Sequence, residues 1–133
     1  DQPKTRFVAE FIGETNLLEG KVEAISDNQI SVALSSGQTI TTSNPSNVTA
    51  GQPVLVSVRP ERIGFATDVA SNANLISAKV VDCVYQGDHI RVQLENSLGG
   101  HYIARVDRKS VEPTIGDMIN ASFQPDDCKV ICA

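Results

Sequence analysis

One stretch of this chain occurs twice, as GQPVLVSVRPE at residues 51–61 and as GDMINASFQPD at residues 116–126. The Gly, Ser and Pro recur in register, and an acidic residue follows each Pro. In the first copy Val54, Val56 and Val58 stand at every second position, which is the period of a β-strand. A Pro ends such a strand because it cannot donate to the ladder. The stretch therefore predicts a glycine-led strand that stops at a proline corner, present in two copies.

The repeat extends upstream. Residues 29–34 match residues 89–94, and the offset between copies grows from 60 residues there to 65 at the glycine-led strand, as longer loops in the second copy would cause. Each copy is a hairpin, a third strand, a fourth strand and a corner. Halves of about 55 residues are too small to be stable alone, so we expect one shared core. We place the halves at residues 15–66 and 67–133, joined by the polar stretch 67–74.

The remaining sequence also favours strands. Alternating runs at residues 90–94 and 102–106 are separated from the other runs by turn-forming residues such as Ser35-Ser36-Gly37 and Gly87-Asp88. Short strands that alternate with turns every 8 to 12 residues or so are typical of a barrel or sandwich. We therefore predict an all-β domain of two tandem, small barrel-like halves.

A helical period precedes the strands, over residues 3–13. Its apolar residues lie at i, i+1, i+4 and i+5 and share one face: Phe7, Val8, Phe11 and Ile12. Gly13 can end the helix, which is too short to be stable alone and must dock on something. Because Asp1 opens the chain without a Met, we expect residues 1–14 to be a linker helix from a preceding domain.

Composition limits the partners. The 133 residues carry a net charge of −5, with two Tyr, four Phe and no Trp. Nucleic-acid binders normally need a basic surface and aromatic platforms for bases, so we predict no nucleic-acid partner. No apolar run approaches the roughly 20 residues of a membrane span, and no signal peptide pattern is present. These features predict a soluble domain.

The three cysteines do not form a disulfide or zinc pattern. Cys128 and Cys132 lie four residues apart in a predicted terminal strand, roughly 13 Å from each other. A disulfide needs Cα atoms within about 7 Å, and a zinc site needs a second ligand pair. We expect reduced thiols of a cytosolic protein. A bridge from Cys83 to one of the other two is the alternative.

Motifs for catalysis are absent from the sequence. It has no glycine-rich phosphate loop and no nucleophile elbow. His89 and His101 stand on the two strands of a predicted hairpin, where they could face each other and hold a metal. Each occupies the polar phase of its strand, which favours two solvent-facing residues instead. We predict no catalytic, cofactor-binding or metal-binding residue.

Four residues are candidates for an interface. Arg59 and Glu61 flank the first proline corner, where a guanidinium fork suits a partner or an anion; a local salt bridge is the alternative. Tyr85 and Asp88 lie where a strand enters a tight turn at Gly87. Tyr85 either caps the core or contacts a ligand or partner.

Several of these motifs resemble a known family. Residues 3–18, PKTRFVAEFIGETNLL, resemble the segment that follows the nucleotide-binding domain of ABC importer ATPases, where a helix leads into a transport-associated OB (TOBE) domain. Residues 58–61 resemble the Arg-Pro-Glu corner that ends the first half, and residues 80–88 resemble the second half. Residues 13–16, GETN, are most similar to the spermidine/putrescine branch. Iron, sulfate and sugar importers are the alternatives.

The resemblance implies a regulatory and dimerisation domain with two OB-like halves. In that family the Walker motifs, ATP and Mg²⁺ belong to the upstream domain, so this chain would not be an enzyme. Its partners would be its own ATPase domain, a second copy, the permease subunits and, in some members, a small solute. The location would be cytoplasmic, at the inner face of the membrane. Only Arg59 and Glu61 carry over, as the shared corner. A free solute sensor for molybdate, sulfate, iron or sugar is the alternative function, followed by an OB-type nucleic-acid binder.

Overall fold

The computed structural model describes residues 14–43, 47–65, 73–109 and 112–132. Within these ranges the protein is all-β, with ten strands and two 3₁₀ turns. The predicted linker helix falls on residues that lie outside the described ranges. None of the described residues belongs to a helix long and apolar enough to cross a membrane.

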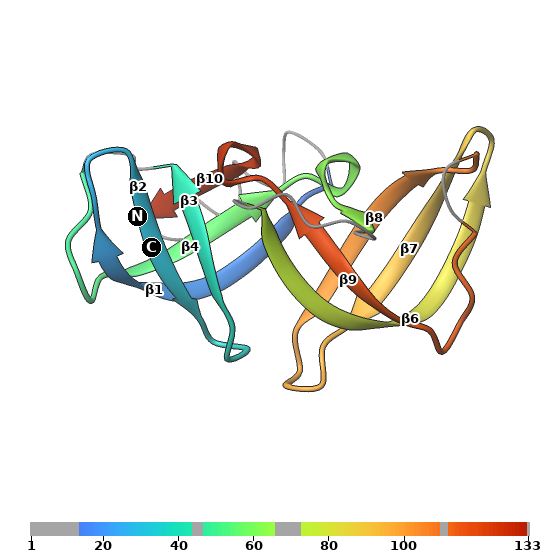
Figure 1. Ribbon diagram of the computed structural model, residues 1–133, viewed down its shortest axis with the longest axis horizontal. Coiled ribbons are helices and arrows are strands. Elements are labelled where there is room, and N and C mark those ends of the chain that lie inside the picture. Colours follow the sequence, from blue (N-terminus) through green and yellow to red (C-terminus); the bar gives the residue numbers. More distant parts are fainter. Residues whose placement is uncertain (1–13, 44–46, 66–72, 110–111, 133) are drawn as a thin grey trace.

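The strands form two antiparallel five-stranded sheets, which curl beside each other in Figure 1. Sheet A has the order β10 (Cys128–Cys132), β4 (Pro53–Val58), β1 (Asn16–Ile25), β2 (Gln29–Leu34) and β3 (Thr39–Ser43). Sheet B has the order β5 (Gly64–Phe65), β9 (Met118–Phe123), β6 (Asn74–Gln86), β7 (His89–Glu95) and β8 (His101–Asp107). The 3₁₀ turns η1 (Pro60–Arg62) and η2 (Pro125–Asp127) follow β4 and β9.

The sequence repeat corresponds to a repeat in the structure. Strands β4 and β9 follow Gly51 and Gly116, whose φ angles of 86° and 99° are favourable only for glycine. Each strand ends at a proline that opens a 3₁₀ turn. Strands β1 and β6 also share a β-bulge, at Glu23 and Val81 respectively. The two halves therefore have the same backbone plan.

Each half gives its last strand to the other half. Strand β5, which follows the first corner, pairs with β9 in sheet B. Strand β10, which follows the second corner, pairs with β4 in sheet A. The proline corners redirect the chain across the molecule, so the halves are interlocked through hydrogen bonds. The predicted range 67–133 thus contains a strand that completes the sheet of the first half.

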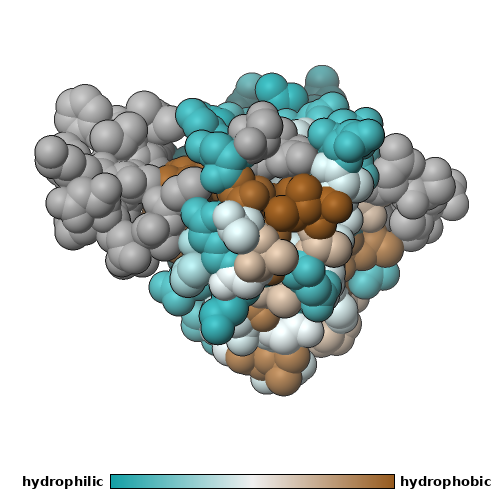
Figure 2. Space-filling view, turned by 90° about the vertical axis from the view of Figure 1, so that its left-hand side faces the viewer, coloured by the Kyte–Doolittle hydropathy of each residue, from teal (hydrophilic) through white to brown (hydrophobic). Residues whose placement is uncertain are grey.

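A single hydrophobic cluster contains side chains from both sheets, including Val32, Val56 and Val58 from sheet A and Ile76, Val92 and Phe123 from sheet B. This is the shared core expected from the small size of the halves. At the surface, the end formed by sheet A shows hydrophilic side chains around a group of hydrophobic ones (Figure 2). The buried core cluster shared by the two sheets supplies the hydrophobic stabilisation that neither half is large enough to provide alone.

Cys83 and Cys128 are both free thiols. The predicted alternative of a bridge from Cys83 to one of the other two cysteines is therefore wrong. Cys128 does lie in a terminal strand, as predicted, and its side chain is buried. Burial is the main cause that raises the pKa of its thiol to about 12. Such a thiol stays protonated and unreactive at neutral pH.

Candidate functional site

Two buried asparagines tie the halves together. Asn16 and Asn74 open β1 and β6, the equivalent strands of the two halves. Asn16 bonds both backbone groups of Ile103 in β8, accepting its N–H at 2.7 Å and donating to its carbonyl at 2.9 Å, and it also donates to the carbonyl of Val58 at 2.9 Å. Asn74 bonds both backbone groups of Thr41 in β3, each at 2.8 Å. Each first strand therefore fixes an edge strand of the opposite sheet.

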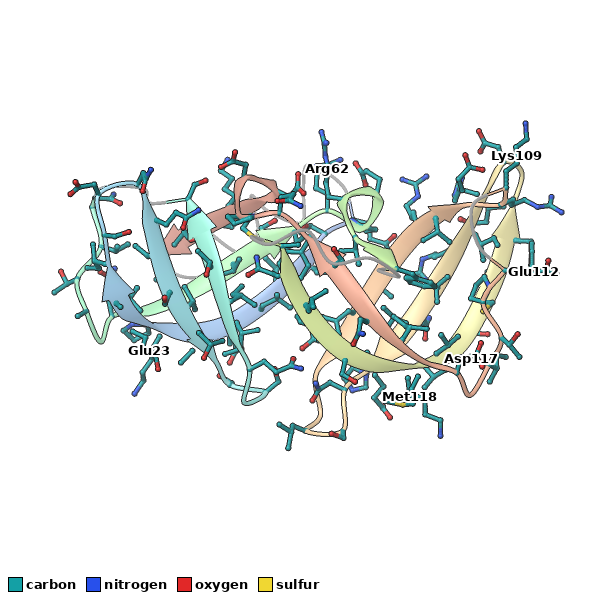
Figure 3. All side chains as sticks on the ribbon, in the orientation of Figure 1. Glu23, Arg62, Lys109, Glu112, Asp117 and Met118 are labelled. Carbon is teal, nitrogen blue, oxygen red and sulfur yellow. The ribbon has the colours of Figure 1, made fainter. Side chains whose placement is uncertain are left out.

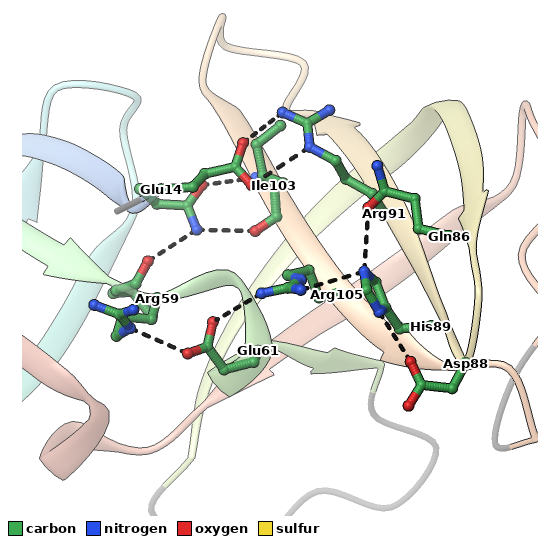
Figure 4. Close-up of polar contacts among 11 residues, drawn as sticks. Glu14, Arg59, Glu61, Gln86, Asp88, His89, Arg91, Ile103 and Arg105 are labelled. Atoms are coloured by element: carbon green, nitrogen blue, oxygen red, sulfur yellow. Dashed lines mark hydrogen bonds and ion pairs between the residues drawn. The ribbon is translucent and has the colours of Figure 1, made fainter. Parts of the chain in front are cut away.

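A charged pair lies beside the first of these asparagines (Figure 4). The Arg91 guanidinium, on β7, donates to the Glu14 carboxylate through Nη2 at 2.5 Å and Nε at 3.4 Å. This hydrogen bonding lowers the pKa of Glu14 and raises the pKa of Arg91. Residues 14–16, where the described chain enters the domain, are thus bound to the β7–β8 hairpin of sheet B as well as to sheet A.

The proline corner carries a second charged group. The Nε of Arg59 donates to Oε2 of Glu61 at 3.1 Å, and Nη1 of Arg105 lies 4.0 Å from Oε1 of Glu61. The backbone N–H of Glu61 itself, followed by Arg59, lowers the pKa of the Glu61 carboxyl. The local salt bridge considered for this corner is therefore present. Because these side chains are nearly half exposed, the pair contributes little to stability.

His89 connects the corner to the next turn. Its Nε2 lies 3.3 Å from Nη2 of Arg105 and 3.1 Å from Oε1 of Gln86, and its Nδ1 lies 3.2 Å from Oδ1 of Asp88. Three of the predicted interface residues, Arg59, Glu61 and Asp88, therefore belong to one polar network that runs over the outer face of the hairpin (Figure 4).

Tyr85 does not belong to this network. Its side chain is 51% exposed, so the interpretation that it caps the core is wrong. The guanidinium carbon of Arg108 lies 5.3 Å from the centre of its ring, which is a cation–π distance. The tyrosine that is buried is Tyr102 on β8. Tyr85 stays a candidate contact residue at the β6–β7 turn.

The two histidines do not face each other. His89 lies opposite Asp107 and His101 lies opposite Glu95, so they stand at opposite ends of the β7–β8 hairpin. The antiparallel register, which the sequence pattern alone does not determine, separates them. His101 pairs with Glu95 at 3.6 Å. Among the described residues no group of three or more His, Cys, Asp and Glu side chains could hold a metal ion.

A cavity of about 330 Å³ lies between the equivalent turns of the two halves. Ser36 and Tyr102 meet there through their hydroxyl oxygens at 3.2 Å. Its lining mixes leucines with polar groups, and among the described residues that line it there is neither Lys nor Arg: Leu17, Leu18, Glu19, Leu34, Ser35, Ser36, Leu98, Gly99, Gly100, His101 and Tyr102. The lining thus combines the Glu19 carboxylate with hydroxyl groups and the His101 imidazole.

The sequence interpretation missed the residues that hold the network together. Asn16 and Asn74 carry a signal, because Asn-Leu opens both copies of the repeat once it is extended upstream. Glu14 and Arg91 carry none, since they are 77 residues apart in the chain. Arg105 occupies a polar position in the alternating run 102–106, which by itself indicates no partner. Nothing in this arrangement forms a nucleophile and base pair; it is a set of contacts that fixes the chain entry and the hairpin.

Comparison with known proteins identifies the family. A model of the TOBE domain matches residues 56–131. This chain belongs to the TOBE domain family.

The relatives found by sequence have similar names. The chain is 31% identical over 97% of its length to the spermidine/putrescine import ATP-binding protein PotA of Rubrobacter xylanophilus, and covers 34% of that protein. It is 32% identical over 98% of its length to the protein of the same name from Ruegeria pomeroyi, covering 35% of it. It is 35% identical over 74% of its length to the protein of the same name from Nostoc sp., and it covers 27% of that protein. The chain spans about a third or less of the length of these relatives.

A solved structure supports the fold. The cytoplasmic molybdate-binding protein ModG, with molybdate bound, superposes with a TM-score of 0.80 over 89% of this chain and 96% of that one. The sequence identity is 15%, so this likeness concerns the fold alone.

Proposed function

We propose that this chain is the C-terminal regulatory and dimerisation domain of the ATP-binding subunit of an ABC importer. The TOBE family match is the observation that carries the proposal, and the names of the longer relatives support it. ATP and Mg²⁺ would bind in the part of the parent protein that precedes this domain. The parent would work with permease subunits at the cytoplasmic face of the membrane, and its domain would contact a second copy of itself.

Polyamines are the proposed cargo. The relatives are named for spermidine and putrescine import. The leading segment of the chain resembles the same branch. Because fold alone does not determine function, these sequence likenesses carry the assignment of cargo.

The geometry at the chain entry fits a regulatory role. Glu14 is bound to Arg91, and Asn16 is bound to Ile103 and Val58. A displacement of the β7–β8 hairpin would therefore move the segment that leads toward the proposed ATPase domain. Coupling between two sites requires a structural element that can adopt two arrangements, and each site must change the balance between those arrangements. The joint of residues 14–16 is where such an element would act.

A charge swap in the full-length parent tests the proposal. The parent would be reconstituted with its permease subunits in vesicles, and spermidine-stimulated ATP hydrolysis would be measured. We expect E14R to weaken the stimulation and the double variant E14R/R91E to restore it, because the pair reforms with reversed charges. The matched control is R62E, since Arg62 lies 4.0 Å from Asp127 and is 63% exposed. Absence of ATP hydrolysis by the parent, or equal stimulation in E14R and R62E, would contradict the proposal.

A solute sensor is the second candidate. The cavity between the two turns favours it, and the fold resembles that of the cytoplasmic molybdate-binding protein ModG. The Glu19 carboxylate in the lining favours an amine over molybdate or sulfate. A thermal-shift panel with spermidine, putrescine, molybdate, sulfate, ferric ion and maltose tests it. A ligand at 100 times its Kd stabilises the native state by about 2.7 kcal/mol; no shift with any solute would rule out sensing by this domain.

A further inference from the structure

Most of the large exposed apolar side chains in the described part of the chain belong to the half that contains sheet B. Seven large hydrophobic side chains are exposed among the described residues. Two of the seven lie elsewhere than on β6, on β9 or just before β9. The other five lie on β6, just before β9 and at the first residue of β9: Val81, Val84, Tyr85, Ile115 and Met118. Soluble proteins seldom group exposed apolar residues without a binding role.

Three of these residues come from neighbouring stretches of backbone, and we name them the end patch: Val81, Ile115 and Met118. Val81 is the bulged residue of β6. Its neighbour Val80 exchanges backbone hydrogen bonds of 2.8 Å with Gly116 and Asp117, the two residues between Ile115 and Met118. The exposed fractions are 37% for Val81 and 63% for each of the other two.

The other half shows that the fold does not require these apolar residues. The same bulge and the same pair of hydrogen bonds occur in sheet A, where Val22 bonds Gly51 at 2.7 Å and Gln52 at 2.9 Å. The positions equivalent to the end patch are Glu23, Ala50 and Pro53. A charged, a small and a cyclic residue thus serve the same backbone geometry. The apolar side chains in sheet B need a reason other than folding.

The position of the end patch leaves the chain entry free. Asn16 enters at the junction of the two halves, and β10 ends the described chain in sheet A. Met118 and Asp117 lie along the lower edge of the right-hand half of the molecule in Figure 3, which is the half formed by sheet B. The end patch and the chain entry at Asn16 thus belong to different parts of the molecule.

We propose that the end patch is the surface through which this domain contacts a second copy of itself. This inference rests on the proposed dimerising function and names its surface. The rim carries both signs of charge, with Lys79 paired opposite Met118 on one side and Asp82 and Asp117 on the other. In a two-fold contact the same patch meets itself, so Lys79 of one copy comes near an acidic residue of the other.

The contact is weak on its own. Stable interfaces bury about 800 Å² on each partner, and three side chains cover only a part of that area. Association of this domain therefore reaches appreciable levels only at high concentration. In the full-length parent, contacts between the ATPase domains would add to it through their high effective concentration.

Analytical ultracentrifugation of the 133-residue chain up to about 1 mM tests the proposal. We expect concentration-dependent dimer formation in the wild type and a Kd raised about tenfold or more in I115E. The matched control is A50E, because Ala50 is also exposed and precedes Gly51 as Ile115 precedes Gly116. A50E should dimerise like the wild type. The milder M118S should weaken association several-fold, so the test does not depend on one variant.

A wild type that stays monomeric at about 1 mM, or equal Kd values for I115E and A50E, would overturn the proposal. Thermal unfolding of each variant shows whether it is folded. These measurements do not use ATP. If the domain does not associate but the parent still hydrolyses ATP, only the end patch is rejected. If the domain does dimerise but the parent has no ATPase activity, only the proposed function is rejected.

Discussion

Sheets A and B share a backbone plan, but the contacts that complete them differ. Sheet A receives β10, a strand of five residues, whereas sheet B receives β5, a strand of two. Asn16 makes three hydrogen bonds to backbone groups, whereas Asn74 makes two and lies 3.9 Å from the Cys128 sulfur. The repeated residues thus specify the backbone, and the residues that differ specify which contacts each half makes with the rest of the molecule.

Removal of β10 is the strongest test of the strand exchange. Deletion of residues 128–133 leaves the backbone groups of β4 that face β10 without partners. Each buried unpaired group costs about 1–3 kcal/mol, and a domain of this kind has about 5–15 kcal/mol of stability in total. We expect the truncated chain to lose cooperative unfolding in urea, followed by circular dichroism.

The substitution K129A in the same strand is the control, because Lys129 is exposed. Its stability should change by less than about 0.5 kcal/mol. Cooperative unfolding of the truncated chain with an unchanged m-value would mean that each sheet is complete without the strand from the other half.

The two asparagines allow a direct comparison of the halves. N16A leaves three backbone groups of Ile103 and Val58 without their partner, and N74A leaves two of Thr41. We expect a loss of about 3 kcal/mol for N16A and about 2 kcal/mol for N74A in urea unfolding.

The exposed S26A serves as reference for the asparagine variants, since the hydroxyl of Ser26 bonds a carbonyl three residues away. It should cost less than about 0.5 kcal/mol. Losses below that value for both asparagines would show that edge strands β3 and β8 are held by other contacts.

The repeat explains why much of this fold could be predicted. Glycines before β4 and β9 and prolines after them are local signals, and they correctly gave the strand ends and the corners. The strand exchange could not be predicted, because a proline corner does not indicate which sheet the following strand joins. Of the predicted interface residues, Arg59 and Glu61 are two positions apart and their pairing is local. Long-range pairs such as Glu14 with Arg91 have no such signal.

The thiols of Cys128 and Cys83 lie in different environments in the two sheets. Cys128, in sheet A, is buried and its pKa is raised to about 12, chiefly by burial. Cys83, in sheet B, is partly exposed, and burial followed by Asp82 raises its pKa too. A thiol whose pKa is raised by folding stabilises the native state below the pKa of the unfolded chain. This contribution is lost as the pH rises toward 12.

We therefore expect the stability difference between the wild type and C128A to shrink above about pH 9, by at most about 1.4 kcal/mol per pH unit. Urea unfolding at pH 7, 9 and 10 measures it. A thiol reagent at pH 8 should also modify Cys83 before Cys128. A stability difference independent of pH would show that the Cys128 thiol ionises equally in both states.

The pair of Glu14 and Arg91 gives the smallest expected effect on stability. Because Arg91 holds the pKa of Glu14 below its usual value of 4.5, the pair stabilises the native state above that pH and loses its effect as the pH falls. The Glu14 side chain is 44% exposed and solvent screens the pair, so E14Q should cost at most about 1 kcal/mol at pH 7. The cost should vanish near pH 3, as urea unfolding at both pH values would measure.

Glu23 is the matched control for E14Q, because it lies on β1, the strand that follows Glu14. It is exposed on the bulge of that strand and points outward in Figure 3. E23Q should leave stability unchanged at both pH values. A cost for E14Q that persists near pH 3 would mean that the side chain acts by packing rather than by charge. The small energetic contribution of the Glu14 pair is what makes it suitable for a joint: it orients the chain entry without adding a barrier that the proposed ATPase cycle would have to overcome.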